Sequence, residues 1–178
     1  MICGVDEAGK GSVLGPMVVA AVGCTDMDDL IALGVADSKK LSSKSREKIS
    51  ADIKAQFPFS IVIRTAHDID ELRRTMTMNE IVARSHAEAL TPLQCTCAYV
   101  DACDVSEERY EETVSSFSPP DCTIVARHKA DSLFPPVSAA SIIAKVERDR
   151  IIEELSLEYG DIGSGYPSDP VTITYLTK

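Results

Sequence analysis

The sequence lacks a long apolar run, and it lacks a recognisable secretion signal. No stretch reaches the roughly 18 residues of a membrane-spanning helix. Met1 leads directly into apolar residues that predict a core strand, without the basic and apolar regions of a signal peptide. These absences exclude a helical membrane protein and predict a cytoplasmic protein with no membrane partner.

Basic residues are also scarce. The 178 residues include 18 Lys and Arg against 28 Asp and Glu, which gives a net charge of −10. Such an acidic chain is not expected to coat nucleic acid without specificity. A local basic groove with bound metal ions would still allow nucleic-acid binding, because the carboxylates that hold the ions contribute to this charge. The length and the 44% hydrophobic content predict one domain with a substantial core.

The six cysteines do not follow a zinc-binding pattern. Without a secretion signal they are expected to be reduced. Cys95, Cys97 and Cys103 lie close together in sequence, but structural zinc sites usually show two pairs with C-x₂₋₄-C spacing. We therefore interpret the cysteines as small buried thiols in the sheet.

The first predicted strand ends in two acidic residues. Asp6 and Glu7 follow the apolar stretch that begins at Met1, and Gly9 and Gly11 come next. Burying two adjacent carboxylates is costly unless a positive charge compensates, and Mg²⁺ prefers carboxylate oxygens. Because strand side chains alternate between faces, the two acids can share one ion only if the backbone twists out of the ladder at Glu7. The alternative is an ordinary acidic turn.

A dinucleotide-binding loop is another alternative for this region. The spacing of Gly9, Gly11 and Gly15 is loosely similar to the glycine pattern of such loops. That pattern requires a following helix whose N-terminus receives the pyrophosphate. Here Pro16 and a second apolar strand follow, and the two acids would repel the phosphates. The short connection instead predicts an antiparallel pair of strands.

Further strands and helices alternate along the rest of the chain. Expected strands cover residues 1–5, 16–24, 59–66, 97–101 and 121–126, and expected helices cover 43–56, 68–72, 77–90, 105–117 and 135–159. Residues 26–35 are expected to be a connector with one helical turn. His86 falls within the 77–90 helix, where we expect a surface or half-buried residue with no chemical task.

Two more acids follow apolar runs later in the chain. One run leads into Asp101, and a later run leads into a charged segment that contains His128 and Asp131. Asp101 has the alternative role of capping the next helix. His128 has the alternative role of a general base, but orienting its loop is the favoured interpretation.

Six separated motifs resemble, in the same order, those of the type 2 ribonucleases H, especially the archaeal and eukaryotic branch. They are residues 4–16 (GVDEAGKGSVLGP), 37–41 (DSKKL), the Met78-Asn79 pair, 100–102 (VDA), 128–131 (HKAD) together with 135–150, and 165–167 (GYP). Lys10 stands where most members have Arg. The resemblance covers nearly the whole chain, and the set is far more specific than any single motif.

The resemblance implies an α/β ribonuclease-H-like fold, with a mixed five-stranded sheet flanked by helices and the strand order 3-2-1-4-5. One catalytic domain would span residues 1–178. The ends of strands one and four would lie side by side and bring Asp6, Glu7 and Asp101 together. With Asp131, these carboxylates would form the catalytic site and hold two Mg²⁺ or Mn²⁺ ions.

The resemblance also implies a set of substrate contacts, which are Gly9, Lys10, Gly11, Lys39, Lys40, Asn79, Lys129, Ser138, Lys145 and Tyr166. Backbone groups of the glycine loop and the Tyr166 ring would read the sugar of the ribonucleotide being cut. Alternatives stay open at three places. Lys39 and Lys40 can belong to a solvated basic face, Asn79 can cap a helix, and Tyr166 can pack only against its own loop.

The implied activity is metal-dependent endonucleolytic hydrolysis. The substrates would be the RNA strand of RNA/DNA hybrids and ribonucleotides embedded in a DNA duplex, with 5′-phosphate and 3′-hydroxyl products. The protein would act as a monomer. From residue 172 the chain departs from the family and shows no sliding-clamp docking peptide, which predicts a short or truncated C-terminal region. The alternatives are a junction resolvase of the same fold and a catalytically inactive nucleic-acid-binding module.

Overall fold

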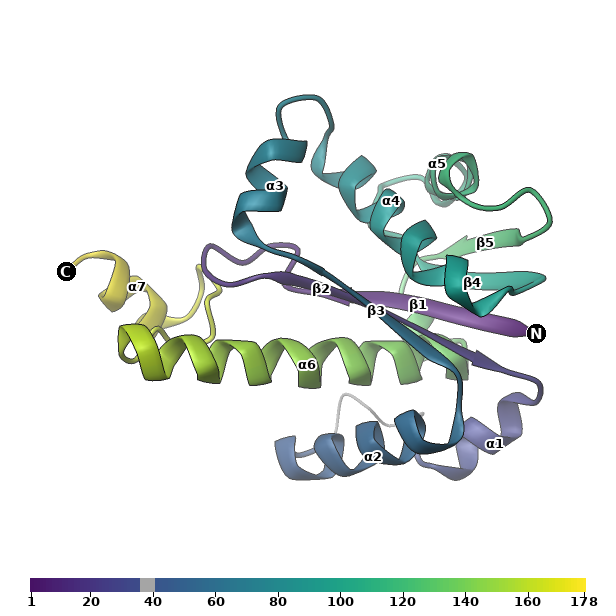
Figure 1. Ribbon diagram of the computed structural model, residues 1–178, viewed down its shortest axis with the longest axis horizontal. Coiled ribbons are helices and arrows are strands. Elements are labelled where there is room, and N and C mark those ends of the chain that lie inside the picture. Colours follow the sequence, from purple (N-terminus) through teal and green to yellow (C-terminus); the bar gives the residue numbers. More distant parts are fainter. Residues whose placement is uncertain (36–40) are drawn as a thin grey trace.

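The computed structural model describes residues 1–35 and 41–178, and a five-stranded sheet lies at its centre (Figure 1). The strands are β1 (Ile2–Ala8), β2 (Met17–Cys24), β3 (Phe59–Arg64), β4 (Cys97–Asp101) and β5 (Thr123–Arg127). They lie in the order β3-β2-β1-β4-β5, which confirms the expected order. Antiparallel pairs join β1, β2 and β3, whereas β1, β4 and β5 run parallel, so the sheet is mixed.

Helices cover both faces of the sheet (Figure 1). On one side lie α1 (Met27–Ala32), α2 (Ser43–Gln56) and α6 (Pro135–Tyr159), and on the other lie α3 (Ala66–Leu72), α4 (Met78–Leu90) and α5 (Glu107–Phe117). Two 3-10 turns, η2 (Thr91–Leu93) and η3 (Ala130–Ser132), and the terminal helix α7 (Pro170–Leu176) complete the described elements. Within residues 1–35 and 41–178, no helix has both the length and the apolar composition needed to cross a membrane.

β2 is buried along its whole length, with all eight residues buried. Its side chains alternate between two hydrophobic cores. Val19 and Ala21 belong to the core beneath α4 and α5, while Val18 and Ala20 belong to the core beneath α1, α2 and α6. This two-sided burial explains why β2 is a continuous apolar run in the sequence rather than an alternating one.

The long helix α6 lies directly against β1. A Cβ atom at Gly4 would lie 2.2 Å from the backbone nitrogen of Val137, so only glycine fits there. Prolines in the first turn suit a helix start, because backbone N–H groups there have no helical partner. Gly160, with a φ of 86°, ends the helix. The predicted helix over residues 135–159 is confirmed.

Hydroxyl side chains cap the starts of α2 and α4. Ser42 caps α2, and Thr77 caps α4 through a capping box. Asn79 is the second residue of α4, so the interpretation of Asn79 as a cap is wrong. Residues 26–35 contain the six-residue helix α1, which Asp26 caps.

Candidate active site

Acidic residues gather where the parallel strands β1, β4 and β5 end. Val5 of β1 lies opposite Val100 of β4, so the next residues, Asp6 and Asp101, lie on adjacent strands at one level. β5 pairs in parallel with β4. The η3 turn follows β5 and brings Asp131 close enough to act electrostatically on the carboxylate of Asp101.

The acidic residues form one electrostatic cluster. Asp6 is 7% exposed and Asp131 is 9% exposed. Burial raises the pKa of Asp6 well above its ordinary value, and the carboxylates of Glu7 and Asp101 raise it further. Burial also raises the pKa of Asp101, although the Ala130 N–H donates to this carboxylate at 2.6 Å and partly offsets the rise. Since buried negative charge is unfavourable by itself, the cluster favours either protons or a bound cation.

The expected twist of the backbone at Glu7 is wrong. Asp6, Glu7 and Ala8 continue the regular antiparallel register with β2. The two acidic side chains therefore point to opposite faces of the sheet, Asp6 toward Ser141 of α6 and Glu7 toward His86 of α4. Within the described ranges, no three Asp, Glu, His or Cys side chains are already arranged to hold one metal ion.

His86 belongs to this site, which corrects the expectation of a surface or half-buried residue without a task. Its side chain is fully buried, and its Nε2 atom lies 2.9 Å from Oε2 of Glu7. Its Nδ1 atom lies 3.1 Å from the hydroxyl oxygen of Tyr110. A signal was present in the sequence, because His86 follows Val82 by one helical turn and precedes Ala89 by another, so it shares their apolar face.

Arg148 holds Tyr166 and the glycine loop after β1 together. The Tyr166 hydroxyl accepts a hydrogen bond from the N–H of Gly9 at 2.9 Å. The Arg148 guanidinium carbon lies 4.5 Å from the centre of the Tyr166 ring, and the residue is 2% exposed. Its guanidinium also donates to three backbone carbonyls, those of Leu14, Pro16 and Ser164. The sequence predicted no role for Arg148, which packs three separate segments against one another.

Two glycines allow this close packing. Gly9 and Gly165 have positive φ angles of 93° and 78°. A Cβ atom at Gly9 would lie 2.5 Å from Nε of Arg148, and one at Gly165 would lie 2.4 Å from the carbonyl oxygen of Leu14. Either substitution would push the loops apart. Gly11 differs, because a Cβ atom there would meet nothing within 4 Å.

A groove of about 420 Å³ lies beside the glycine loop. It is lined by Gly9, Lys10, Ser12, Val13 and Gly15 of the loop and by Ala66, Ile69, Asp70, Arg73 and Met78. The ammonium group of Lys10 donates to the carbonyl of Cys103 at 3.0 Å. This contact joins the loop to the segment that follows Asp101. None of the four clustered carboxylates lines the groove itself.

The remaining predicted substrate contacts have varied surroundings. The side-chain amide of Asn79 lies 3.4 Å from the carboxylate of Asp104. Lys129 and His128 are exposed, and Lys145 is half-buried.

Ser138 is the one predicted contact that the structure corrects. It is 1% exposed, and its hydroxyl donates to the carbonyl of Val35 at 2.5 Å, so this hydroxyl serves the packing of α6 rather than a substrate. Lys39 and Lys40 lie outside the described residues.

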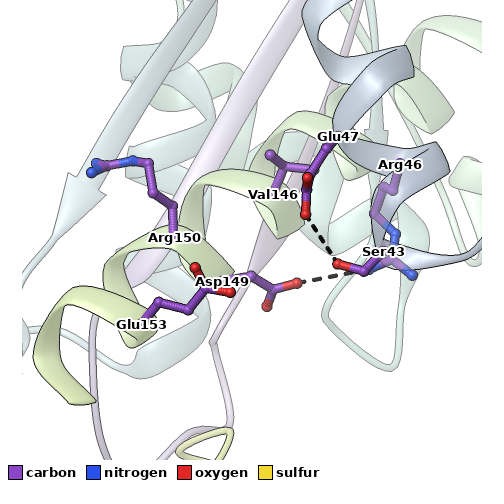
Figure 2. Close-up of a pocket in the computed structure, with 7 residues that line it drawn as sticks. All are labelled: Ser43, Arg46, Glu47, Val146, Asp149, Arg150 and Glu153. Carbon is purple, nitrogen blue, oxygen red and sulfur yellow. Dashed lines mark hydrogen bonds and ion pairs between the residues drawn. The ribbon is translucent and has the colours of Figure 1, made fainter. Parts of the chain in front are cut away.

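Figure 2 shows a different pocket, of about 310 Å³, between α2 and α6. It is lined by Ser43, Arg46, Glu47, Val146, Asp149, Arg150 and Glu153. Arg46 forms an ion pair with Asp149 at 3.7 Å, and the Ser43 hydroxyl donates to Glu47 at 3.2 Å. Neither the four clustered carboxylates nor any residue of the glycine loop lines this pocket, so it is separate from the candidate active site.

A mixed sheet in this strand order, covered by helices and carrying acidic residues at the ends of its parallel strands, defines a nuclease of the ribonuclease-H-like fold. Solved ribonucleases HII and HIII share the fold. The chain belongs to the ribonuclease HII family, whose family model matches residues 3–178. It is therefore an endoribonuclease of the ribonuclease H type, a hydrolase.

Individual relatives match almost the whole chain. Ribonuclease HII of Methanospirillum hungatei JF-1 is 98% identical over 178 residues, which are 100% of this chain and 84% of that protein. Ribonuclease HII of Archaeoglobus fulgidus, solved as a complex with PCNA, matches with a TM-score of 0.94 and 46% identity over 99% of this chain and 85% of that one. Bst-RNase HIII, solved in complex with Mn²⁺, matches with a TM-score of 0.77 and 26% identity over 89% of this chain and 55% of that one.

Proposed function

We propose that this endoribonuclease cuts the RNA strand of RNA/DNA hybrids and also cuts at ribonucleotides embedded in a DNA duplex, leaving 5′-phosphate and 3′-hydroxyl ends. Asp6, Glu7, Asp101 and Asp131 are its catalytic residues and its ligands for two divalent ions. The observation that carries the proposal is the electrostatic coupling among these four carboxylates, at strand ends that lead into the loop that Tyr166 contacts.

The donor atoms suit Mg²⁺ or Mn²⁺. Hard divalent cations prefer carboxylate oxygens. Burial, together with mutual repulsion, raises the pKa of both Asp6 and Asp101, and a bound cation would offset both penalties. When bound, such ions lower the pKa of a water molecule and stabilise charge on the leaving oxygen. The Mn²⁺ bound by a ribonuclease HIII of the same fold supports this choice.

The chain's own residues would orient the substrate and sense its sugar. Proteins tell RNA from DNA through the 2′-hydroxyl. The Tyr166 ring, which Arg148 holds in place, would pack on the ribose, and backbone groups of Gly9, Lys10 and Gly11 would meet its hydroxyls. The N–H of Gly9 already donates a hydrogen bond to the Tyr166 hydroxyl, so a ribose hydroxyl would have to share or replace that contact.

Positive side chains around the groove would neutralise phosphates. Lys10 lines the groove, and Lys129 and Lys145 are the other lysines of this set within the described ranges. Lys39 and Lys40 remain proposed contacts from the motif alone, and Asn79 remains a proposed contact beside Asp104. The footprint is local, which suits a chain that is acidic as a whole.

Several wider properties also remain proposals. Residues 1–178 would fold as one catalytic domain that acts as a monomer in the cytoplasm. A sliding clamp is a proposed partner on the evidence of the Archaeoglobus fulgidus relative alone, whose solved structure contains PCNA, because the sequence itself shows no docking peptide. Titrating PCNA into the protein and following the size of the complex would test this partner.

The proposed activity is tested with a DNA duplex that contains one ribonucleotide, incubated with protein and Mg²⁺. The expected result is one cut beside the ribonucleotide, with a 5′-phosphate and a 3′-hydroxyl at the new ends. An all-DNA duplex of the same sequence is the matched control and should stay intact. Cleavage of a four-way DNA junction instead would favour a resolvase. Binding without any cleavage would favour an inactive nucleic-acid-binding module.

A further inference from the structure

A series of hydrogen-bonded side chains leads from the interior of the protein to Glu7. The Oε2 atom of Glu7 on β1 lies 2.9 Å from Nε2 of His86 on α4, and Nδ1 of His86 lies 3.1 Å from the hydroxyl of Tyr110 on α5. His86 is 0% exposed and Tyr110 is 1% exposed, while the side chain of Glu7 keeps 11% exposure. This series of side chains therefore ends at Glu7, which is the most exposed of the three.

The two rings fix each other's orientation. Their centroids lie 5.9 Å apart and their planes are perpendicular, at 90°. A buried imidazole with a partner on each nitrogen has little freedom to rotate, because close packing and both contacts favour one rotamer. The direction of the Glu7 carboxylate is therefore set by α4 and α5 and not by β1 alone.

The hydrogen-bond donors can be assigned along this chain. Burial raises the pKa of Tyr110, and Cys103 and Glu7 raise it further, so the hydroxyl keeps its proton. When the Tyr110 hydroxyl donates to Nδ1 of His86, the ring proton lies on Nε2 and is donated to Glu7. With this assignment, both ring nitrogens of His86 and the hydroxyl of Tyr110 each take part in a hydrogen bond.

A histidine that only filled the core would not need these contacts. Val82 and Ala89, on the same face of α4, are fully buried without polar side-chain atoms. An apolar residue at position 86 would pack there without the cost of burying two ring nitrogens. His86 instead engages one carboxylate oxygen of a residue at the candidate active site.

We propose that His86, oriented by Tyr110, is a positioning residue that fixes the Glu7 carboxylate for metal binding and thereby raises the affinity of the site for divalent cations. The inference rests on the proposed function, because it takes Glu7 to be a metal ligand. Groups that orient a metal ligand in this way typically change metal affinity by about 10–100-fold.

Calorimetric titration of the protein with MnCl₂, without nucleic acid, tests the proposal. His86→Leu keeps the volume of the side chain but removes both nitrogens, and it should weaken Mn²⁺ binding by about 10-fold or more. His86→Gln, whose amide N–H can donate to Glu7, should recover most of that loss. Tyr110→Phe removes only the hydroxyl and should give an intermediate loss.

Kinetics should show a matching pattern. In His86→Leu, cleavage at low Mn²⁺ should be slow, and saturating Mn²⁺ should restore most of kcat, while KM for the duplex should stay unchanged. A role confined to folding would lower the melting temperature without moving the Mn²⁺ midpoint. Val82→Ala is the matched control, because it opens a cavity one turn away on the same face. It should melt earlier and bind Mn²⁺ as the unmodified protein does.

Glu7→Gln separates failure of this inference from failure of the proposed function. If Glu7→Gln binds Mn²⁺ as the unmodified protein does, the ligand set itself is wrong. If Glu7→Gln weakens binding but His86→Leu leaves it unchanged, only the positioning role is overturned. Should His86→Leu fail to fold, unchanged Mn²⁺ affinity in Tyr110→Phe overturns the role instead.

Discussion

The surroundings of the Asp6 carboxylate disfavour its negative charge. Burial, with Glu7 and Asp101 nearby, raises its pKa. A carboxylate whose pKa is higher in the folded state stabilises the fold only when protonated. That contribution is full below its unfolded pKa of about 3.9 and is lost as the pH rises through the folded-state value. Without metal, the charge on Asp6 should therefore reduce the stability of the folded protein at neutral pH.

Asp6→Asn should melt in EDTA at the same temperature as the unmodified protein or at a higher one. The advantage of the variant should grow as the pH rises above about 4, because only the unmodified protein must ionise a buried group. Thermal unfolding followed by circular dichroism at several pH values measures this. Glu153→Gln, at an exposed position of α6, is the control and should change little. A clear loss of stability in Asp6→Asn at neutral pH would show that Asp6 is structural.

Tyr166 joins two interactions that can be separated by mutation. Tyr166→Phe loses the hydrogen bond from Gly9 but keeps the ring over Arg148, whereas Tyr166→Ala loses both. Tyr166→Ala should therefore lose most activity, and Tyr166→Phe should lose less. The loss in Tyr166→Ala should be at least as large on a duplex with one ribonucleotide as on an all-RNA strand, since no neighbouring ribose can compensate. Wild-type rates on the single-ribonucleotide duplex would remove Tyr166 from sugar recognition.

Residues that stand out in a local sequence pattern could be predicted, whereas residues whose roles depend on tertiary contacts could not. Asp6 and Asp101 were predicted as site residues because an acid at the end of an apolar strand is visible in the sequence. His86 was missed, although it lies on the apolar face of its helix, because its partners Glu7 and Tyr110 come from other elements. The same limit explains the wrong expectation for Ser138, whose partner lies over 100 positions away.

At the scale of elements, the glycine loop, α6 and the Tyr166 segment act as one unit because Arg148 links them. The start of α2 was predictable from a local capping signal, and that of α6 from its prolines. The strand order came from the family resemblance, since local patterns do not specify which strands pair. The linkage through Arg148 was not predictable, because its three acceptors are backbone carbonyls that any sequence would supply.

Arg148→Met should destabilise the protein by roughly 2–4 kcal/mol, because each orphaned buried carbonyl costs about 1–3 kcal/mol and part of this cost is relieved by relaxation. It should also lower cleavage, since the Tyr166 ring loses its support. Urea unfolding gives the stability, and an assay on the single-ribonucleotide duplex gives the activity.

Arg150→Met is the matched control for this helix. Arg150 is half exposed and pairs with Glu147 and Glu154 on the surface, so the change should cost less than about 1 kcal/mol. Equal effects of the two substitutions would contradict the central position that we assign to Arg148.

The whole molecule is acidic, with a net charge of −10, while its substrate would be a polyanion. We therefore expect few phosphates to be neutralised, by the local set of lysines proposed above. Affinity for an RNA/DNA hybrid should accordingly be weak. It should fall only modestly as salt rises from about 50 to 200 mM, because few counterions are released on binding. Fluorescence anisotropy with a labelled hybrid measures it. Nanomolar affinity, or a steep fall over this range, would contradict the expectation, because either would mean that many phosphates are neutralised.

Cleavage by the four carboxylate variants tests the central claim most directly. Asp6→Asn, Glu7→Gln, Asp101→Asn and Asp131→Asn are each assayed in Mg²⁺ on the duplex with one ribonucleotide, beside Glu153→Gln as the control. Each of the four should fold and should lose roughly a hundredfold or more in rate, because a missing ligand removes several kcal/mol of charge stabilisation. The control should cut at the wild-type rate. A folded variant of any of the four that still cuts at that rate would contradict the assignment of a shared metal site.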